Sequence, residues 1–390
     1  MTKTLERGAD GATPHGDAAT GARGRGRRAI RAARRNRKLV VGASIVCAFY
    51  LVALLADFLA PNDFREQLRG EPLAPPTAIH FFDAEGNFHA RPFVHARRLA
   101  DPLRRRYEED ASRRYPLELF ARGHRYKLLG LFETDRHLVG LRRDPEAAGG
   151  ASASSSSAPR LHLLGTDHLG RDRLARLLRA SRFTLVVGPV GTLLASLLGV
   201  ALGCVAGYAG RWVDAALMRA ADAMMALPSL VIIIAARAAF PLELPPTRAA
   251  VLLVGLFVAT GWAEMARLAR GLILALRRRE FVLAAESLGL SRGRVLVRHI
   301  LPNAAGPLLV QATLMLPAFL LAETALSFLG VGVQEPEPSW GNMLSAASDI
   351  SLLRESPFLL LSPALCIFLF VLGVRLLSDG LRARQEKTPS

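Results

Sequence analysis

Apolar residues gather in long runs along this chain, and polar stretches of unequal length separate the runs. The first run covers residues 39–60, which is enough for one helix to cross about 30 Å of hydrocarbon at 1.5 Å per residue. Five more runs of similar length follow, near residues 183–209, 213–238, 249–268, 303–330 and 357–378. The pattern therefore predicts an all-α integral membrane protein with about six transmembrane helices.

The polar stretches divide the chain into unequal parts. The longest follows the first span, lacks any apolar run of membrane length and ends in the Ser-rich linker GGASASSSSA. Within it, IHFFDAEGNFHARPFV alternates on both sides of AEGN, which predicts a strand, a turn and a second strand. We expect a basic arm (residues 1–38), a first span (39–60), an enlarged loop with its linker (61–182), a core of five spans (183–380) and a tail (381–390).

Basic residues predict which way the chain crosses the membrane. Nine of the sixteen residues from Arg23 to Lys38 are basic, and they lie directly before the first span. Positive charge beside a span stays in the cytoplasm, so we expect a cytoplasmic N-terminus in the inner membrane. Six spans then return the C-terminus and the arginine-rich residues 269–302 to the cytoplasm, and they leave residues 61–182 outside.

The composition narrows the classes of function. A formal net charge of +17 admits nucleic acid as a partner. However, only 7% of the residues are aromatic and they do not alternate with basic ones, so we expect no nucleic-acid partner. Cys47, Cys204 and Cys366 lie inside apolar runs at spacings that match no metal site.

The stretch GTDHLGRD holds the most suggestive polar residues outside the spans. His162 and His168 flank Asp167, which invites a metal site, but two solvated imidazoles on a short loop are the stronger interpretation. The stretch lacks the Gly-Lys-Ser/Thr of a phosphate-binding loop. We therefore expect a chain that binds no metal and no nucleotide and that is not an enzyme.

Residues 281–303, FVLAAESLGLSRGRVLVRHILPN, are polar and basic although apolar runs lie on both sides. Gly289 is expected to end a first short helix with positive φ, Ser291 to cap a second, and Pro302 to open the fifth span. A helical spacing of i, i+3, i+4 and i+7 gives the first helix one apolar face, made of Phe281, Ala284, Ala285 and Leu288. The alternative interpretation is an amphipathic helix on lipid headgroups.

Two carboxylates and two prolines fall inside predicted spans. Asp222 and Glu323 are candidates to line a translocation path, because charge at membrane depth is costly and faces a bundle interior or a cavity. The structural interpretation, an interhelical pair, is favoured for Asp222, and both stay open for Glu323. Pro228 and Pro317 predict kinks, whether hinges or simple bends.

Two more residues near the outer ends of spans have a predicted place. Arg237 is expected to extend its charge to the membrane surface. Trp340, in SWGNML, is expected to anchor the membrane interface rather than contact a docked protein.

AAESLG followed by HILPN resembles the EAA loop of bacterial ATP-binding-cassette (ABC) importer permeases. Leu283 stands where that family usually has Glu, and His299 where many members have Ile, although His is usual in the peptide branch. The positions that match the family pattern are Ala284, Ala285, Gly289, Leu301 and Pro302.

Three other segments resemble the "C" permease of the dipeptide/oligopeptide/nickel family. They are RNRKLVVGASIV before and within the first span, LLGTDHLGRDRLARLLRASRFTL at 163–185 and ETALSFLGVGVQEPEPSWGNML at 323–344. The resemblance covers residues 35–382 apart from 62–160, where the loop is longer than in most members. It implies the type I ABC importer permease fold.

The resemblance also implies function and partners. The chain would form half of a peptide pathway with a second homologous permease, while an extracytoplasmic binding protein delivers cargo. One or two ATPase subunits, which carry ATP and Mg, would dock on the 280–302 loop. The residues implied in coupling are Phe281, Ala284, Ala285, Glu286, Gly289, His299, Leu301 and Pro302. Alternatives are nickel, opine or glycoside cargo, or a secondary transporter or membrane scaffold without an ATPase.

Overall fold

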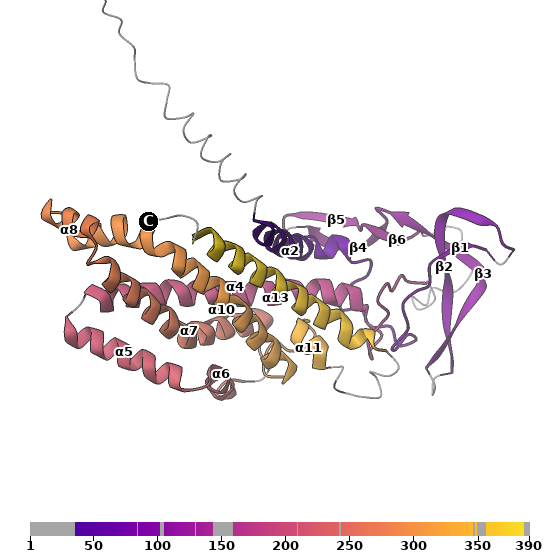
Figure 1. The fold of residues 1–390 in the computed structure, drawn as a ribbon. Helices are drawn as coiled ribbons and strands as arrows, with labels where there is room; N and C mark the ends of the chain where they lie inside the picture. Colours follow the sequence, from indigo (N-terminus) through magenta and orange to yellow (C-terminus); the bar gives the residue numbers. More distant parts are fainter. Residues whose placement is uncertain are drawn as a thin grey trace, which may run out of the picture.

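The computed structural model describes residues 36–83, 85–101, 105–128, 130–142, 159–208, 210–241, 243–345, 348 and 356–385. Most of the predicted basic arm, the Ser-rich linker and the last residues of the tail lie outside these ranges. The described chain divides into a long helical body and a smaller part made of strands, which lies at one end of the body (Figure 1).

Five helices are long and apolar enough to cross a membrane. They are α2 (Arg37–Leu54), α4 (Arg173–Tyr208), α7 (Pro246–Leu276), α10 (Leu301–Phe328) and α13 (Phe358–Gln385). A sixth span is completed if α5 (Arg211–Ala226) and α6 (Ser229–Ala238), which bend by 86° at their junction, count as one. The predicted number of spans is therefore confirmed as five or six.

The structure corrects two predicted boundaries. Pro228 does not kink a continuous helix but stands in extended conformation before α6, so the predicted span 213–238 is broken there. Pro317, in contrast, lies inside α10. Helix α4 begins at Arg173, ten residues before the predicted residue 183. Its first three turns carry four arginines that find acidic or carbonyl partners, so the helix extends where the sequence looked too polar.

The centre of the helical body is the contact of α4 with α7. A Cβ on Gly199 would lie 2.6 Å from the Trp262 carbonyl oxygen, and one on Gly203 would lie 2.6 Å from that of Ala266. Small residues let the two backbones approach closely, as they do between membrane helices generally. The neighbouring core includes Phe257 of α7, stacked at 4.8 Å on Phe319 of α10.

Helix α2 packs on α13, so the first and last spans are neighbours. A Cβ on Gly42 would lie 2.4 Å from the backbone nitrogen of Leu377. The Asn36 side chain accepts from Leu39 N to cap α2 and donates to the Gly380 carbonyl at 2.8 Å. The start of α2 and the end of α13 therefore lie next to each other.

The strands come from the enlarged loop after the first span. One antiparallel sheet has the order β1-β2-β3-β6, and β4 pairs with β5 in a separate hairpin. The predicted strand, turn and strand are confirmed, since Phe82 of β1 pairs with Phe88 of β2 across a turn held by Asp83. The strands are β1 (His80–Phe82), β2 (Phe88–Asp101), β3 (Arg106–Leu119), β4 (Arg122–Leu128), β5 (Phe132–Arg136) and β6 (Val139–Leu141).

Short helices complete the described chain. They are α3 (Ala56–Leu59), α8 (Glu280–Ser287), α9 (Arg292–Val295), the π-turn η2 (Leu296–Ile300) and α11 (Trp340–Ser345). Helix α8 lies at the end of the body that is farthest from the sheet of β1, β2 and β3 (Figure 1).

Candidate functional site

Helix α8 follows α7 after only three arginines, residues 277–279, and its ends are well defined. Glu280 in its first turn is favourable beside the positive end of the helix dipole. At its other end Gly289 has φ +82°, as predicted. Gly289 N donates to the Glu286 carbonyl and Leu290 N donates to the Ala285 carbonyl. These two hydrogen bonds are the pair that defines a Schellman cap. The chain therefore turns sharply from α8 toward α9.

One face of α8 packs against the helical body. Val282 and Ala285 are buried together with Ile273 of α7, and Val295 and Ile300 close the cluster from α9 and η2. Cys204 and Tyr208, in the last turns of α4, pack against the same cluster. A displacement of α8 is thus resisted by α4, by α7 and by α9 and η2, which lead into α10.

Arg277 strengthens this junction. Its guanidinium lies 4.7 Å from the centroid of the Tyr208 ring and donates to the Gly207 carbonyl at 2.7 Å. The carbonyls in the last turn of a helix lack partners within the helix, so this bond satisfies one of them. Arg277 thereby fixes the end of α7 to the end of α4.

The other face of α8 is exposed and apolar. Phe281 is 41% exposed, Leu288 is 81% exposed and Ala284 lies between them. Leu283 and Glu286 are exposed as well. The predicted apolar face is therefore wrong in one member: Ala285 belongs to the buried face, because α9 and η2 cover that side of the helix.

The remaining predicted coupling residues lie along η2 and the start of α10. His299 and Leu301 are half-buried, and Pro302 is exposed in the first turn of α10, as predicted. The His299 carbonyl accepts from Asn303 Nδ2 at 2.6 Å. Ser291 stands at the start of α9, but its side chain makes no capping bond, so that part of the prediction is wrong.

The two carboxylates predicted inside spans have different surroundings. Asp222 of α5 forms an ion pair with Arg267 of α7, and both side chains are at least half exposed. A second pair joins the same helices, with Arg270 Nη2 2.6 Å from Asp214 Oδ2. Asp222 therefore has an interhelical ion-pair partner, which is the role that the sequence favours for it over lining a translocation path.

Glu323 is fully buried within the subunit. Its Oε1 accepts from Ser327 Oγ at 2.8 Å, while Oε2 has no hydrogen-bond partner among the described residues. The residues around it belong to α4 and to the segment at α11, where Trp340 N donates to Thr184 Oγ1. A role of Glu323 in the path stays a prediction.

Two predictions for the outer ends of spans are wrong. Trp340 is fully buried and meets Phe49 of α2 edge to face at 5.8 Å, so it joins α11 to the core instead of anchoring the interface. Arg237 is 1% exposed and donates to the carbonyls of Phe240 and Pro241. Its guanidinium binds the backbone after α6 and does not extend to the surface.

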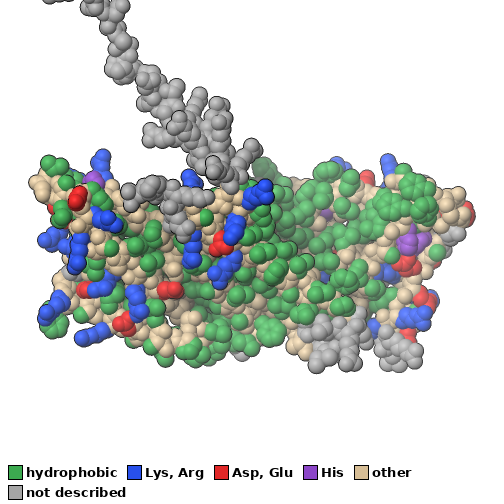
Figure 2. Space-filling model, in the orientation of Figure 1, with side chains coloured by type: hydrophobic (Ala, Val, Ile, Leu, Met, Phe, Trp, Pro, Cys, Tyr) green, Lys and Arg blue, Asp and Glu red, His purple; other side chains and the backbone are tan. Residues whose placement is uncertain are grey.

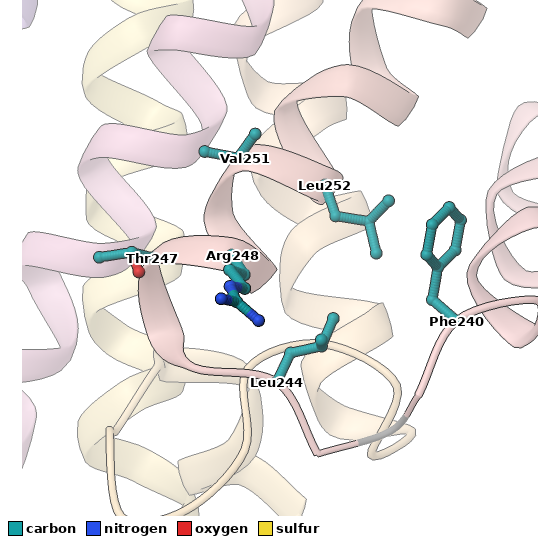
Figure 3. A pocket seen from close by; sticks show the side chains of 6 residues that line it. All are labelled: Phe240, Leu244, Thr247, Arg248, Val251 and Leu252. Atoms are coloured by element: carbon teal, nitrogen blue, oxygen red, sulfur yellow. The ribbon is translucent and has the colours of Figure 1, made fainter.

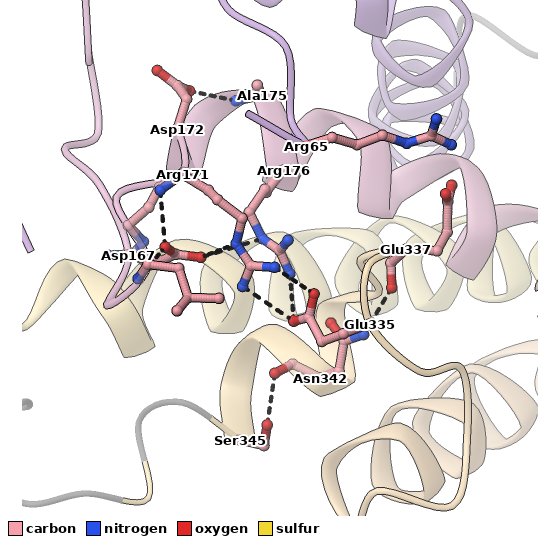
Figure 4. A network of polar contacts seen from close by, with 12 residues as sticks. Arg65, Asp167, Arg171, Asp172, Ala175, Arg176, Glu335, Glu337, Asn342 and Ser345 are labelled. Atoms are coloured by element: carbon pink, nitrogen blue, oxygen red, sulfur yellow. Dashed lines mark hydrogen bonds and ion pairs between the residues drawn. The ribbon is translucent and has the colours of Figure 1, made fainter. Parts of the chain in front are cut away.

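Sequence reasoning missed a cluster of ion pairs around two buried arginines at the start of α4 (Figure 4). Arg171 donates to Asp167 at 2.7 Å and to Glu335 at 2.6 Å, and Arg176 donates to Glu335 at 2.7 Å. Asp167 is four positions from Arg171, but Glu335 is about 160 positions from both arginines. The only available signal was that RDRLAR, residues 171–176, carries three arginines while QEPEP, residues 334–338, is acidic.

His162 belongs to the same region and is buried, contrary to the prediction of a solvated ring. Its Nδ1 lies 2.7 Å from Asp172 Oδ2, and its Nε2 lies 3.1 Å from Glu71 Oε2. The second contact is an ion pair whose geometry falls short of a hydrogen bond. Burial alone would lower the pKa of His162, but the two carboxylates outweigh it and raise the pKa to about 8. His168 is exposed, as expected.

A shallow apolar hollow of about 420 Å³ lies between the end of α6 and the start of α7. Figure 3 shows Phe240, Leu244 and Leu252 converging on it, with Arg248 at its edge. The described residues of this chain leave the hollow open on one side.

Comparison with known proteins gives two matching family models. Residues 199–387 match the binding-protein-dependent transport system inner membrane component. Residues 24–76 match the N-terminal transmembrane domain of oligopeptide transport permease C. Neither model covers residues 77–198, which include most of the enlarged loop.

Individual relatives agree with these models. The chain is 38% identical to the dipeptide transport system permease protein DppC of Alkalihalophilus pseudofirmus, over 57% of this chain and 70% of that protein. It is 38% identical, with the same coverage, to the oligopeptide transport system permease protein OppC of Bacillus subtilis. The dipeptide permease DppC of B. subtilis is 35% identical, over 73% of this chain and 88% of the relative.

Proposed function

This chain belongs to the binding-protein-dependent inner membrane components of transport systems, in the branch of the dipeptide and oligopeptide permeases of ABC importers, and from this premise we propose that it forms half of a peptide translocation pathway driven by partner ATPases. The observation that carries the proposal is α8, which exposes an apolar row on one face and is packed against three spans by the other. Such a helix can receive a force from a soluble partner and pass it to the membrane.

The exposed residues of α8 and η2 suit an ATPase surface. Phe281, Leu288 and Val297 present apolar area, and exposed arginines at 278, 279, 292, 294 and 298 surround them. An apolar centre with a charged rim is the usual arrangement of a protein interface. Leu283, which is 51% exposed, adds apolar contact at the position where the family usually has a glutamate.

The mechanism follows from how α8 is held. When the ATPases close on ATP, they move α8, and the buried cluster with Arg277 transfers the movement to the ends of α4 and α7. Since α4 is the longest helix and packs along α7, the two rock together between inward-open and outward-open states. ATP and Mg belong to the ATPases, so this chain needs no cofactor and is not itself an enzyme.

The other partners follow from the same proposal. A second homologous permease completes the pathway. It would pack on the side of this chain where Asp222 is exposed and where the apolar hollow by Leu252 is uncovered. A binding protein delivers cargo on the side of the strands. Both termini then lie in the cytoplasm, at the end where α2 begins and α13 ends.

Crosslinking tests the coupling role. In a variant without Cys47, Cys204 and Cys366, we expect Ala284→Cys to form crosslinks with single cysteines in the membrane-facing groove of the ATPase, and ATP to change their yield. Ala285→Cys is the matched control, because its side chain is buried and should react little. An assembled complex in which neither Ala284→Cys nor Leu288→Cys crosslinks would contradict the proposal.

Uptake tests the cargo. Cells that depend on this transporter should take up labelled dipeptides or oligopeptides, and Ala284→Arg should abolish the uptake while the complex still reaches the membrane. Uptake of nickel, an opine or a glycoside in place of peptides would keep the coupling mechanism and replace the cargo.

A further inference from the structure

The β4–β5 hairpin has an apolar tip that the transport function does not require. Its strands join at Lys127–Phe132, where Gly130 takes φ +74°. Leu131 is 76% exposed and Phe132 is 66% exposed, which are among the highest values for large apolar residues in the described chain. Side chains of this kind are costly to leave in water, so the tip needs a partner surface.

The root of the hairpin is fixed to the outer end of the first span. Leu138 N, just after β5, donates to the Phe58 carbonyl of α3 at 2.8 Å. Phe58 also packs on Phe120, with ring centroids 6.0 Å apart. Helix α3 follows α2 directly, and Arg182 of α4 donates to the Ala53 carbonyl, which closes the end of α2. The hairpin therefore starts beside the end of the first candidate span.

The tip continues the exposed apolar surface of the first span. Helix α2 buries Gly42 against α13 and exposes Leu51 (57%) and Leu54 (52%) on its other side. Phe120, 54% exposed, extends this apolar surface beyond α3 toward the hairpin. Figure 1 shows the β4–β5 hairpin beside the helices, with β4 in contact with α3, and Figure 2 shows hydrophobic side chains running from the helical body onto the strand side.

The charges on the hairpin suit a phospholipid surface. Arg122, Arg125 and Arg136 are exposed on its strands, and Lys127 beside the tip is exposed and only loosely paired with Glu133 at 3.8 Å. Basic side chains above an apolar end favour anionic headgroups, since the charges meet phosphates while the apolar end enters the acyl boundary.

We propose that the β4–β5 hairpin is a membrane anchor, whose tip inserts Leu131 and Phe132 into the leaflet on the side of the strands while Arg122, Arg125 and Arg136 bind anionic phospholipid headgroups. The anchor holds the enlarged loop against the bilayer. The other hairpin, β1–β2, also exposes Phe82 (61%), but it belongs to the sheet far from the helices and serves as a contrast (Figure 1).

Depth measurements test the anchor. The assembled transporter is placed in nanodiscs of phosphatidylethanolamine and phosphatidylglycerol, with an environment-sensitive fluorophore on Phe132→Cys in the cysteine-free chain. We expect nitroxide-labelled lipid to quench this probe as strongly as one on Leu51→Cys of α2, and aqueous iodide to quench it weakly. A probe on Phe82→Cys is expected to show the reverse. Leu131→Cys replaces Phe132→Cys if that variant does not assemble.

Two results would overturn the proposal. A tip probe that iodide quenches as it quenches the Phe82→Cys probe would place the tip in water. A tip probe protected from both quenchers would mean that another subunit covers the hairpin. The headgroup contact has its own test: nanodiscs without phosphatidylglycerol, or the variant Arg122→Gln/Arg125→Gln, should reduce lipid quenching at least twofold, and unchanged quenching would refute that contact.

Discussion

At the scale of single residues, His162 makes the stability of the loop before α4 depend on pH. Its pKa is raised to about 8 from the ordinary 6.5, so the added stability is complete below about pH 6.5 and is lost as the pH rises through about 8. A shift of this size is worth about 2 kcal/mol. We expect the melting temperature of the purified chain to fall between pH 6 and pH 9.

The variant His162→Gln should remove most of that fall in melting temperature, because it leaves no group to titrate between Asp172 and Glu71. His168→Gln is the matched control, since His168 is exposed on the same loop and should leave the pH dependence intact. An equal fall in wild type and His162→Gln would assign the pH dependence to other groups.

Residues whose role is local could be predicted from the sequence, and residues whose partners are distant could not. Gly289 and Pro302 end and begin helices by their own backbone preferences, and both are confirmed. Trp340 and Arg171 were missed because each depends on a partner far along the chain, Phe49 and Glu335. No spacing within a segment contains that information.

At the scale of elements, the contact of α4 with α7 depends on the absence of side chains at two glycines. We expect Gly199→Ala to destabilise the fold by about 1–3 kcal/mol, because its Cβ would lie 2.6 Å from the Trp262 carbonyl and the helices would have to separate. Gly255→Ala on α7 is the control, since nothing lies within 4 Å of its Cβ. Thermal unfolding in detergent measures both, and equal melting temperatures would contradict the close approach.

Element boundaries were predicted well where hydropathy alone decides them and poorly where polar contacts do. Helix α10 runs through Pro317 and, like α2, α7 and α13, begins within three residues of its predicted start, although α7 and α13 extend eight and seven residues beyond their predicted ends. The start of α4 was placed ten residues late because Arg173 and its neighbours look too polar, although Arg173 donates to the Phe358 carbonyl. The break at Pro228 could not be predicted from hydropathy, because it is visible only in the extended backbone conformation of that residue.

At the scale of the whole molecule, α4 connects two junctions at opposite ends of the helical body, one made of packed apolar side chains and one made of ion pairs. At one end its last turn meets α8 and Arg277, and at the other its first turns enter the ion pairs with Glu335. Arg182 adds a bond to the end of α2. A helix held at both ends moves as a rigid body, which is what the proposed coupling of α8 to the pathway requires.

The ion pairs at the strand end should therefore matter to the whole fold. Arg171→Met leaves the buried Asp167 with only the more distant Arg176 at 3.7 Å and the half-exposed Glu335 with Arg176 alone. Breaking a fully buried pair costs about 3–5 kcal/mol, and the exposure of Glu335 and the remaining Arg176 lower that cost here. Lys127→Met is the control, because that exposed pair is worth about 0–1 kcal/mol. We expect Arg171→Met to lower the melting temperature and the amount of assembled transporter far more than Lys127→Met. If both variants behave like wild type, the ends of α4 are held by packing alone, and the rigid movement of α4 must depend on its glycine contact with α7.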